Sequence, residues 1–141
     1  MKISIGSDHA GFELKQKIIE KYSSFDFDDY GAFSIDSVDY PEFGHKVAKS
    51  ILENKADYGI VVCGSGIGIS IAANRNKGIR AALCTSVDHA KLSRLHNDAN
   101  VLALGSRLTS EEDIYNIIDV FFSTDFEGGR HSDRIKKIDK A

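Results

Sequence analysis

Short apolar runs that alternate with amphipathic helical segments constrain this chain more than any other feature of its sequence. Each run has four to six residues rich in Ile, Val or Phe, which is typical of β-strands. The predicted strands cover residues 3–6, 25–30, 59–63, 79–84 and 101–104. Several runs are apolar throughout, so we expect them to be buried on both faces, as the strands of a parallel sheet are.

Helical patterns fill the segments between and after these strands. The predicted helices cover residues 11–22, 43–53, 69–74, 86–96, a segment from 109 and a basic segment from 129 to the end. We expect Pro41 to open the second helix, Ser86 to cap the fourth and a capping box at Thr109 to begin the fifth. Repeated βαβ units predict a five-stranded parallel sheet with helices on both faces.

The bulk composition fits one globular domain over residues 1–141. The chain is 42% hydrophobic and 28% charged, as ordinary globular proteins are. A formal net charge of -3 argues against nucleic acid as a partner. No apolar stretch reaches the roughly 18 residues that cross a membrane, and the N-terminus does not resemble a signal peptide. Two cysteines do not make a disulfide framework, so we expect reduced thiols in a cytoplasmic protein.

A glycine-rich loop follows the third predicted strand. Gly64, Gly66 and Gly68 alternate in the segment Cys63-Gly64-Ser65-Gly66-Ile67-Gly68. Glycines let the backbone turn sharply and bring its N–H groups close to a ligand, and the helix that follows adds a partial positive charge. The loop therefore suits an anion such as a phosphate, a carboxylate or an enediolate, although a tight turn without a ligand would use the same glycines.

Ile69 excludes two better-known phosphate loops. A dinucleotide fingerprint GxGxxG starting at Gly64 needs Gly at position 69, and a cysteine phosphatase loop starting at Cys63 needs Arg there. A phosphate-binding GxxxxGK[ST] loop needs a Gly-Lys-Ser/Thr triplet, which the sequence lacks. The loop thus indicates an anion that is bound in none of these three ways.

The two cysteines differ in their surroundings. Cys63 heads the glycine-rich loop, where a helix N-terminus and cationic neighbours favour a thiolate that takes a proton or attacks carbon. Cys84 ends an apolar run and is predicted to be an inert core residue, which is the common role of a buried cysteine. We therefore interpret Cys63 as the reactive thiol and Cys84 as a packing residue.

Polar residues follow two other strands. Ligands of open α/β sheets bind outside the carboxyl ends of the strands, and Asp8, His9 and Arg107 follow the first and the fifth strand. Asp8 would accept hydrogen bonds from sugar hydroxyls or cap the next helix. His9 would contact a phosphate or a ring oxygen.

Further candidates lie on helices or near helix ends. His96 begins the polar segment His96-Asn97-Asp98-Ala99-Asn100, and its titration near neutral pH suits proton donation to a sugar ring oxygen. Arg130 and Arg134 are four residues apart and share one helix face, so their two guanidinium groups suit a phosphate. A solvated basic helix is the alternative, because three lysines follow.

Together these residues closely resemble the ribose/galactose isomerase family, in its ribose-5-phosphate isomerase B branch. The resemblance covers nearly the whole chain. The matching segments are Gly6-Ser7-Asp8-His9-Ala10-Gly11-Phe12, Asp39-Tyr40-Pro41, Cys63-Gly64-Ser65-Gly66-Ile67-Gly68-Ile69-Ser70-Ile71-Ala72-Ala73-Asn74, Gly78-Ile79-Arg80-Ala81, Ser93-Arg94-Leu95-His96-Asn97-Asp98-Ala99-Asn100, Leu104-Gly105-Ser106-Arg107 and Glu127-Gly128-Gly129-Arg130-His131. Each segment is weak alone, but their order and spacing are highly specific.

The resemblance implies a flavodoxin- or Rossmann-like α/β/α sandwich of three layers, and reversible conversion of ribose 5-phosphate to ribulose 5-phosphate without metal or cofactor. It implies a homodimer, or a tetramer, with active sites at the subunit interface. Cys63 would move a proton between C2 and C1, and His96 would open the furanose ring near Asp8. The other implied roles are enediolate stabilisation by the Ser65 side chain and by the backbone amides of Gly64, Ser65, Gly66, Ile67 and Gly68, phosphate binding by His9, Arg107, Arg130 and Arg134 with part of this set from the second subunit, and sugar contacts by Asn97 and Tyr40.

At two positions, 65 and 69, members of the family differ from one another. Two other functions are alternatives to the one that the resemblance implies. One branch of the family has a Glu where this chain has Ile69, so Cys63 favours the cysteine-base branch. Ser65 stands where many members have Thr, and its hydroxyl keeps the expected role. The other functions are isomerisation of a hexose 6-phosphate, such as allose or galactose 6-phosphate, and non-catalytic sensing of a sugar phosphate. The thiol and the histidine in one chain favour a self-sufficient enzyme.

Overall fold

The computed structural model describes residues 1–140, and its strands and helices alternate as the sequence predicts. In chain order the elements are β1 (Lys2–Ser7), α1 (Phe12–Lys21), β2 (Asp26–Asp29), α2 (Tyr40–Leu52), β3 (Tyr58–Cys63), α3 (Ile67–Asn74), β4 (Ala81–Leu83), α4 (Val87–Asn97), β5 (Val101–Gly105), α5 (Glu111–Ser123) and α6 (Arg130–Asp139). The five-stranded parallel sheet is confirmed.

The strands lie side by side in the order β2-β1-β3-β5-β4. This order differs from the 2-1-3-4-5 order of flavodoxin in its last two strands, because β5 lies between β3 and β4. The direction of winding reverses between β1 and β3. Open α/β sheets bind ligands at such a reversal point, outside the carboxyl ends of the strands. The topology therefore directs attention to the residues that follow Ser7 and Cys63.

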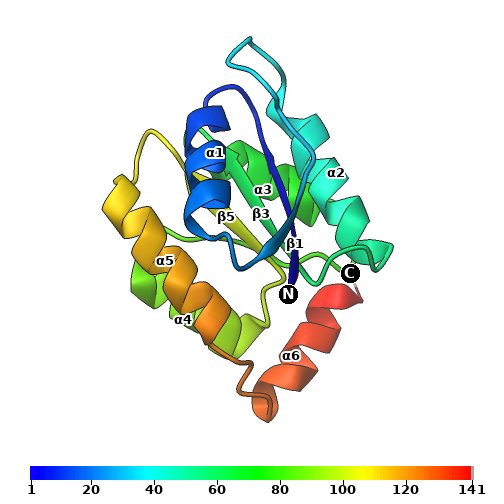
Figure 1. Cartoon of the computed structure of the whole chain (residues 1–141). Helices are drawn as coiled ribbons and strands as arrows, with labels where there is room; N and C mark the ends of the chain where they lie inside the picture. The colour runs from blue at the N-terminus through cyan, green and yellow to red at the C-terminus, as the bar shows by residue number, and fades with distance from the viewer. Residues whose placement is uncertain (141) are drawn as a thin grey trace.

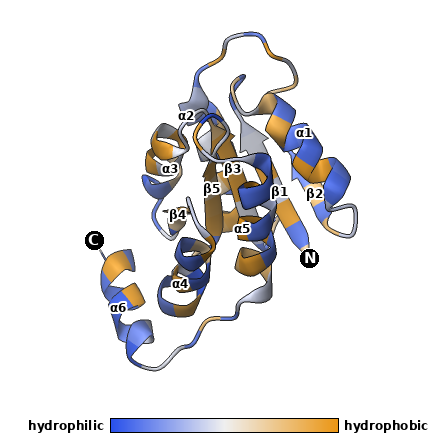
Figure 2. Ribbon diagram, turned by 90° about the vertical axis from the view of Figure 1, so that its left-hand side faces the viewer, coloured by the Kyte–Doolittle hydropathy of each residue, from blue (hydrophilic) through white to orange (hydrophobic). Residues whose placement is uncertain are grey.

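Helices cover both faces of the sheet and make a three-layer sandwich (Figure 1). Ile60 and Val62 of β3 pack with residues of α1, α4 and α5, whereas Val61 and Cys63 pack with residues of α2 and α3. This alternation follows from the two-residue repeat of a strand. Figure 2 shows hydrophobic residues concentrated in the central strands β3 and β5. Each fully buried aliphatic side chain stabilises the fold by about 1.5–3 kcal/mol.

The two edge strands are shorter than their apolar runs predict. β2 and β4 pair on one side only, and their residues are partly exposed. At the free edge of β4 the side chain of Asn74 replaces a neighbouring strand. The Ala81 amide donates to Asn74 Oδ1 at 2.7 Å, and Asn74 Nδ2 donates to the Ala81 carbonyl at 3.0 Å. These two bonds satisfy backbone groups that an edge strand otherwise leaves to solvent.

The helix starts mostly agree with the sequence signals. Pro41 lies in the first turn of α2, and the Ser86 hydroxyl accepts a hydrogen bond from the His89 amide at 3.2 Å. The capping prediction at Thr109 is wrong by one residue. Ser110 caps α5, because its hydroxyl accepts from the Asp113 amide at 3.2 Å.

The last helix, α6, lies at the end of the sheet where the strands begin (Figure 1). It is mostly hydrophilic (Figure 2). An ion pair of 3.0 Å between Arg80 Nη1 and Asp139 Oδ2 ties its far end to the residue that precedes β4. Across residues 1–140, every helix is too short or too polar to span a membrane.

Candidate active site

A pocket of about 630 Å³ opens at the carboxyl ends of β1, β3 and β5. It brings together side chains and backbone that follow three different strands, as the topology predicts. Its lining residues are Asp8, Tyr40, Cys63, Gly64, Ser65, Ile67, Gly68, Ile71, Arg107 and Leu108. We call the predicted site residues at this edge of the sheet (Asp8, His9, Tyr40, residues 63–68 and Arg107) the thiol half.

Cys63 is the last residue of β3, and only 4% of its surface is exposed. Its Sγ atom accepts a hydrogen bond from the Gly66 amide at 3.2 Å. The Ser65 hydroxyl accepts from the Ile67 amide at 3.1 Å. Two amides of the loop therefore donate to side chains of the same loop. The sulfur is thus held in one position beside the N-terminus of α3, where the helix dipole favours negative charge.

Two glycines let the loop fit against its neighbours. Gly66 has φ of +79°, and a Cβ on it would lie 2.8 Å from the backbone carbonyl carbon of Leu104. A Cβ on Gly68 would lie 2.5 Å from the Tyr40 ring, so that ring packs directly on the loop. A side chain at Gly66 would displace the loop from the backbone of β5, and one at Gly68 would displace the loop or the Tyr40 ring, because real Cβ atoms do not approach other atoms this closely.

Asp8 and His9 follow β1 and are both fixed by hydrogen bonds. Asp8 is buried, and its Oδ1 accepts from the Gly11 amide at 3.0 Å, as expected for a carboxylate that precedes a helix. His9 Nδ1 lies 3.2 Å from both the amide nitrogen and the carbonyl oxygen of Val38. His9 is therefore tied to the segment between β2 and α2, which leads directly to Tyr40.

Arg107 closes the thiol half from the side of β5. Its amide donates to the Gly64 carbonyl at 2.9 Å, and the Ser106 amide donates to the Cys63 carbonyl at 2.9 Å. The guanidinium lies over the loop, since a Cβ on Gly64 would be 3.3 Å from Arg107 Nη1. The Arg107 side chain is exposed, so its charge is available to an anion in the pocket.

Four predicted site residues lie at the opposite end of the sheet. His96 and Asn97 end α4, and Arg130 and Arg134 lie on α6. The strand register separates these ends, because β5 begins at Val101 beside Gly59 and ends at Gly105 beside Cys63. Five residues of strand span about 13 Å, and Figure 1 shows α6 at the end of the sheet away from the β2–α2 connection. We call His96, Asn97, Arg130 and Arg134 the histidine half.

The comparisons with known proteins agree with this architecture. A sequence model described as Ribose/Galactose Isomerase matches residues 3–138. The chain belongs to the ribose/galactose isomerase family. It is 43% identical to ribose-5-phosphate isomerase B of Escherichia coli, over 97% of this chain and 93% of the relative.

Solved structures of the ribose/galactose isomerase family share the whole fold. A ribose 5-phosphate isomerase from Thermotoga maritima is 53% identical and superimposes with a TM-score of 0.97, covering 99% of this chain and 98% of the other. Ribose-5-phosphate isomerase B from Mycoplasma genitalium, solved with bound ribulose-5-phosphate, is 43% identical, with a TM-score of 0.94 over 99% and 94% of the two chains. The resemblance expected from the sequence motifs is confirmed.

This family member also contains two residues that sequence reasoning did not single out. His131 is 4% exposed, and its ring stacks on His96 with centroids 4.3 Å apart and planes at 13°. Burial lowers the pKa of His131, and His96, Arg130 and Arg134 lower it further. Lys15 is fully buried and binds both carboxylate oxygens of Asp29 at 2.7 and 2.8 Å. The only sequence signal for Lys15 was its place beside the apolar stripe of α1.

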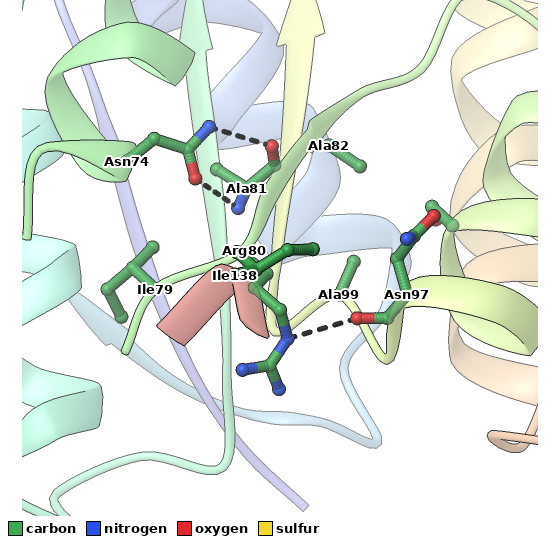
Figure 3. Close-up of a pocket in the computed structure, with 9 residues that line it drawn as sticks. Asn74, Ile79, Arg80, Ala81, Ala82, Asn97, Ala99 and Ile138 are labelled. Carbon is green, nitrogen blue, oxygen red and sulfur yellow. Dashed lines mark hydrogen bonds between the residues drawn. The ribbon is translucent and has the colours of Figure 1, made fainter. Parts of the chain in front are cut away.

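Two further residues named from the sequence, Cys84 and Asn97, lie in the core and at a second pocket. Cys84 is buried, and burial raises the pKa of its thiol to about 11, which agrees with an inert core role. Asn97 lines a second pocket of about 390 Å³ between the edge of β4, α4 and α6 (Figure 3). There the Asn97 carbonyl accepts from Arg80 Nε at 3.0 Å, and Ile138 of α6 borders the pocket. The thiol half has no side chain in this second pocket.

Proposed function

We propose that this chain is an aldose–ketose isomerase that interconverts ribose 5-phosphate and ribulose 5-phosphate, with Cys63 as the base and with no metal or cofactor. The observation that carries the proposal is a buried thiol that accepts an amide hydrogen bond at the mouth of a glycine-rich loop, in a pocket that Arg107 borders. Family membership and relatives named for this reaction support the substrate. We assign the activity to one domain over residues 1–141.

The chemistry requires a group that moves one proton between neighbouring carbons. The Cys63 thiolate removes the C2 proton of the open-chain aldose and leaves an enediolate with its negative charge on O1. The resulting thiol delivers a proton to C1 while the O2 hydroxyl proton passes to O1, which gives the C2 carbonyl and C1 hydroxyl of the ketose and restores the thiolate. The negative charge that develops lies beside the N-terminus of α3, where the Ser65 hydroxyl and the amides of residues 64–68 other than those of Gly66 and Ile67, which donate to Cys63 Sγ and Ser65 Oγ, would stabilise it. A positioned base of this kind speeds a reaction by about 10²–10⁴-fold.

The remaining roles divide between the two halves. We assign opening of the furanose ring to His96 with Asp8, and sugar contacts to Asn97 and Tyr40. The proposed phosphate ligands are His9, Arg107, Arg130 and Arg134. Two of these arginines lie with His96 in the histidine half, at the other end of the sheet from Cys63. One chain therefore cannot place all of these groups around one substrate.

A homodimer with its active sites at the subunit interface resolves this separation. The thiol half of one copy would meet the histidine half of the other, and a two-fold axis then makes two identical sites. Apolar side chains beside the thiol pocket support burial by a second copy, because Ile67, Ile71 and Leu108 are 50%, 53% and 72% exposed. A thiolate base works only while it is reduced, which supports a cytoplasmic location.

Mixed dimers test the shared site. Cys63→Ala and His96→Asn chains should each be nearly inactive, but refolding them together in equal amounts should restore about a quarter of the wild-type activity, because half of the dimers then contain one intact site. The matched control mixes wild-type chains with the double variant. A shared site predicts about a quarter of the wild-type activity there, and a site within one chain predicts about half.

Absence of recovery in the first mixture, together with half activity in the second, would place the whole site in one chain and contradict the proposal. The substrate is tested separately by kcat/KM for ribose 5-phosphate, allose 6-phosphate and galactose 6-phosphate. We expect ribose 5-phosphate to be preferred. A higher kcat/KM for either hexose phosphate would favour the alternative function.

A further inference from the structure

The stacked pair of His96 and His131 is the strongest unassigned feature of the chain. Their ring centroids are 4.3 Å apart, and their planes are within 13° of parallel. His131 is 4% exposed, whereas the His96 side chain is 39% exposed. One ring is therefore fixed in the protein, and it covers one face of the ring that remains accessible.

His131 also joins the two parts of the histidine half. It is the second residue of α6, between Arg130 and Arg134, and it is one of the two buried residues of this helix. The segment before α6 is bonded to the last turns of α4. The Glu127 amide donates to the Leu95 carbonyl at 3.1 Å, and Arg94 Nε donates to the Thr124 carbonyl at 3.2 Å.

The pair is poorly arranged to hold a metal ion. His96, Glu127 and His131 place possible ligand atoms within 4.8 Å of one another. A metal binds imidazole in the plane of the ring, however, and stacked parallel rings place the plane of one ring well away from the other. A cation bonded properly to one ring would lie out of the plane of the second. Face-to-face contact, rather than chelation, is the interaction that this geometry favours.

The charge state of His131 suits such a contact. Burial lowers its pKa, and the nearby positive groups lower it further. His131 Nε2 is buried with no hydrogen-bond partner, which also suits a neutral ring. A neutral His131 ring adds no positive charge beside the arginines of α6 and the face of His96.

We infer that His131 is a positioning residue that stacks on His96 and holds its ring at a fixed place relative to the arginines of α6. The inference rests on the proposed function, in which His96 opens the sugar ring. His131 itself touches neither the substrate nor the reacting atoms in this scheme. Its stack makes one rigid unit of the ring-opening group and the phosphate ligands, so that binding the phosphate places the sugar ring oxygen against His96.

Two variants separate stacking from other effects. His131→Ala removes the stacked ring, whereas His131→Phe keeps an aromatic face and loses only nitrogens, of which Nε2 makes no hydrogen bond. Two rates are measured, namely ribulose 5-phosphate formation from ribose 5-phosphate and solvent deuterium exchange at C1 of ribulose 5-phosphate. The first needs ring opening, whereas the second starts from an open-chain ketose and needs only binding and proton transfer at carbon. We expect His131→Ala to slow the first about ten-fold more than the second, and His131→Phe to restore most of the loss.

A double-mutant cycle tests whether His131 acts through His96. His96→Asn should show the same selective loss, and His96→Asn/His131→Ala should be no slower than His96→Asn alone. Thermal unfolding of each variant shows how much of any loss is loss of folded protein. A purely structural role predicts instead that the two losses multiply and that exchange and conversion fall together, and that result overturns the inference.

The remaining outcomes separate the inference from the function on which it rests. Unchanged conversion of ribose 5-phosphate by His96→Asn overturns the ring-opening role of His96 and the positioning role of His131 with it. A selective loss in His96→Asn with wild-type rates in His131→Ala overturns the positioning role alone. Equal losses in His131→Ala and His131→Phe show that the stacked face is not what matters, and this also overturns the inference.

Discussion

The thiol half and the histidine half are built by different means. Cys63 ends a central strand, is 4% exposed and lies in a loop whose amides bond to its own polar atoms. His96 ends a helix, and 39% of its side chain is exposed. Arg130 and Arg134 lie on a hydrophilic helix that is held to α4 by a few contacts.

This difference matches the tasks that we propose for the two halves. Proton transfer at carbon depends on a base held close to its target, and Cys63 is held by its strand and by the Gly66 amide. A phosphate is a large, multiply charged group. Guanidinium groups bind it over a wider range of positions than a base can occupy in proton transfer. The more exposed half therefore binds the end of the substrate that tolerates variation, and the buried thiol meets the reacting carbons.

Removing the thiol should give the largest effect. Cys63→Ala is expected to lower kcat by about 10³-fold or more, because the proposed base is lost, while sugar-phosphate binding measured by calorimetry persists. Cys84→Ala is the matched control and should retain kcat, since that thiol is buried in the core. Near-normal turnover by Cys63→Ala would remove Cys63 from the mechanism.

Breaking the buried ion pair beside the thiol half should give the next largest effect, on stability. Lys15 is fully buried, and Asp29, its partner, also accepts from the Gly31 amide at 2.9 Å. Lys15→Met should lower the free energy of unfolding by about 3 kcal/mol, measured by urea denaturation. Lys17→Met breaks an exposed pair with Glu111 and should cost no more than about 1 kcal/mol. An equal loss of unfolding free energy in the two variants would show that burial of the Lys15 ion pair does not increase its contribution to stability.

Weakening the phosphate grip of the histidine half should act on binding. Arg134→Ala is expected to raise KM by about 10- to 100-fold, the loss of a charge-assisted hydrogen bond, with a much smaller change in kcat. Lys137→Ala on the same helix is the control for a general loss of positive charge. If KM stays at the wild-type value in Arg134→Ala, this face of α6 is simply solvated.

Acid should lower the free energy of unfolding through His131, and this should be the smallest effect of the four. The pKa of His131 is lowered from 6.5 in the folded chain, so the unfolded chain binds a proton more readily. This stability is fully present above pH 6.5 and is lost as the pH falls through the folded-state pKa. Urea unfolding at about pH 7.5 and 5.5 should show a larger loss in the wild type than in His131→Phe. An identical pH dependence would mean that His131 does not titrate on unfolding.

Much of the fold and the thiol half could be predicted because their signals are local. Apolar runs give buried strands, and a glycine-rich segment after such a run gives a loop at the carboxyl edge. The edge strands were predicted too long, since pairing on one side only depends on strand order. The buried charge of Lys15 was missed because its partner, Asp29, lies on another element.

The separation of His96 from Cys63 follows from topology, which residue types alone do not reveal. A helix that connects parallel strands runs from the carboxyl end of one strand to the amino end of the next. The last turn of α4 must therefore lie at the opposite edge from the glycine-rich loop. The stacking partner His131 comes from a later helix, and no spacing in the sequence links it to His96.

The placement of the two halves at opposite ends of one sheet has a consequence for how much protein is needed. Under the proposed arrangement a lone chain is silent, and turnover begins only when two copies meet. Specific activity should then fall on dilution below the dissociation constant of the dimer. A cell that makes few copies would have less than proportional flux, so abundance itself would act as a threshold on the reaction.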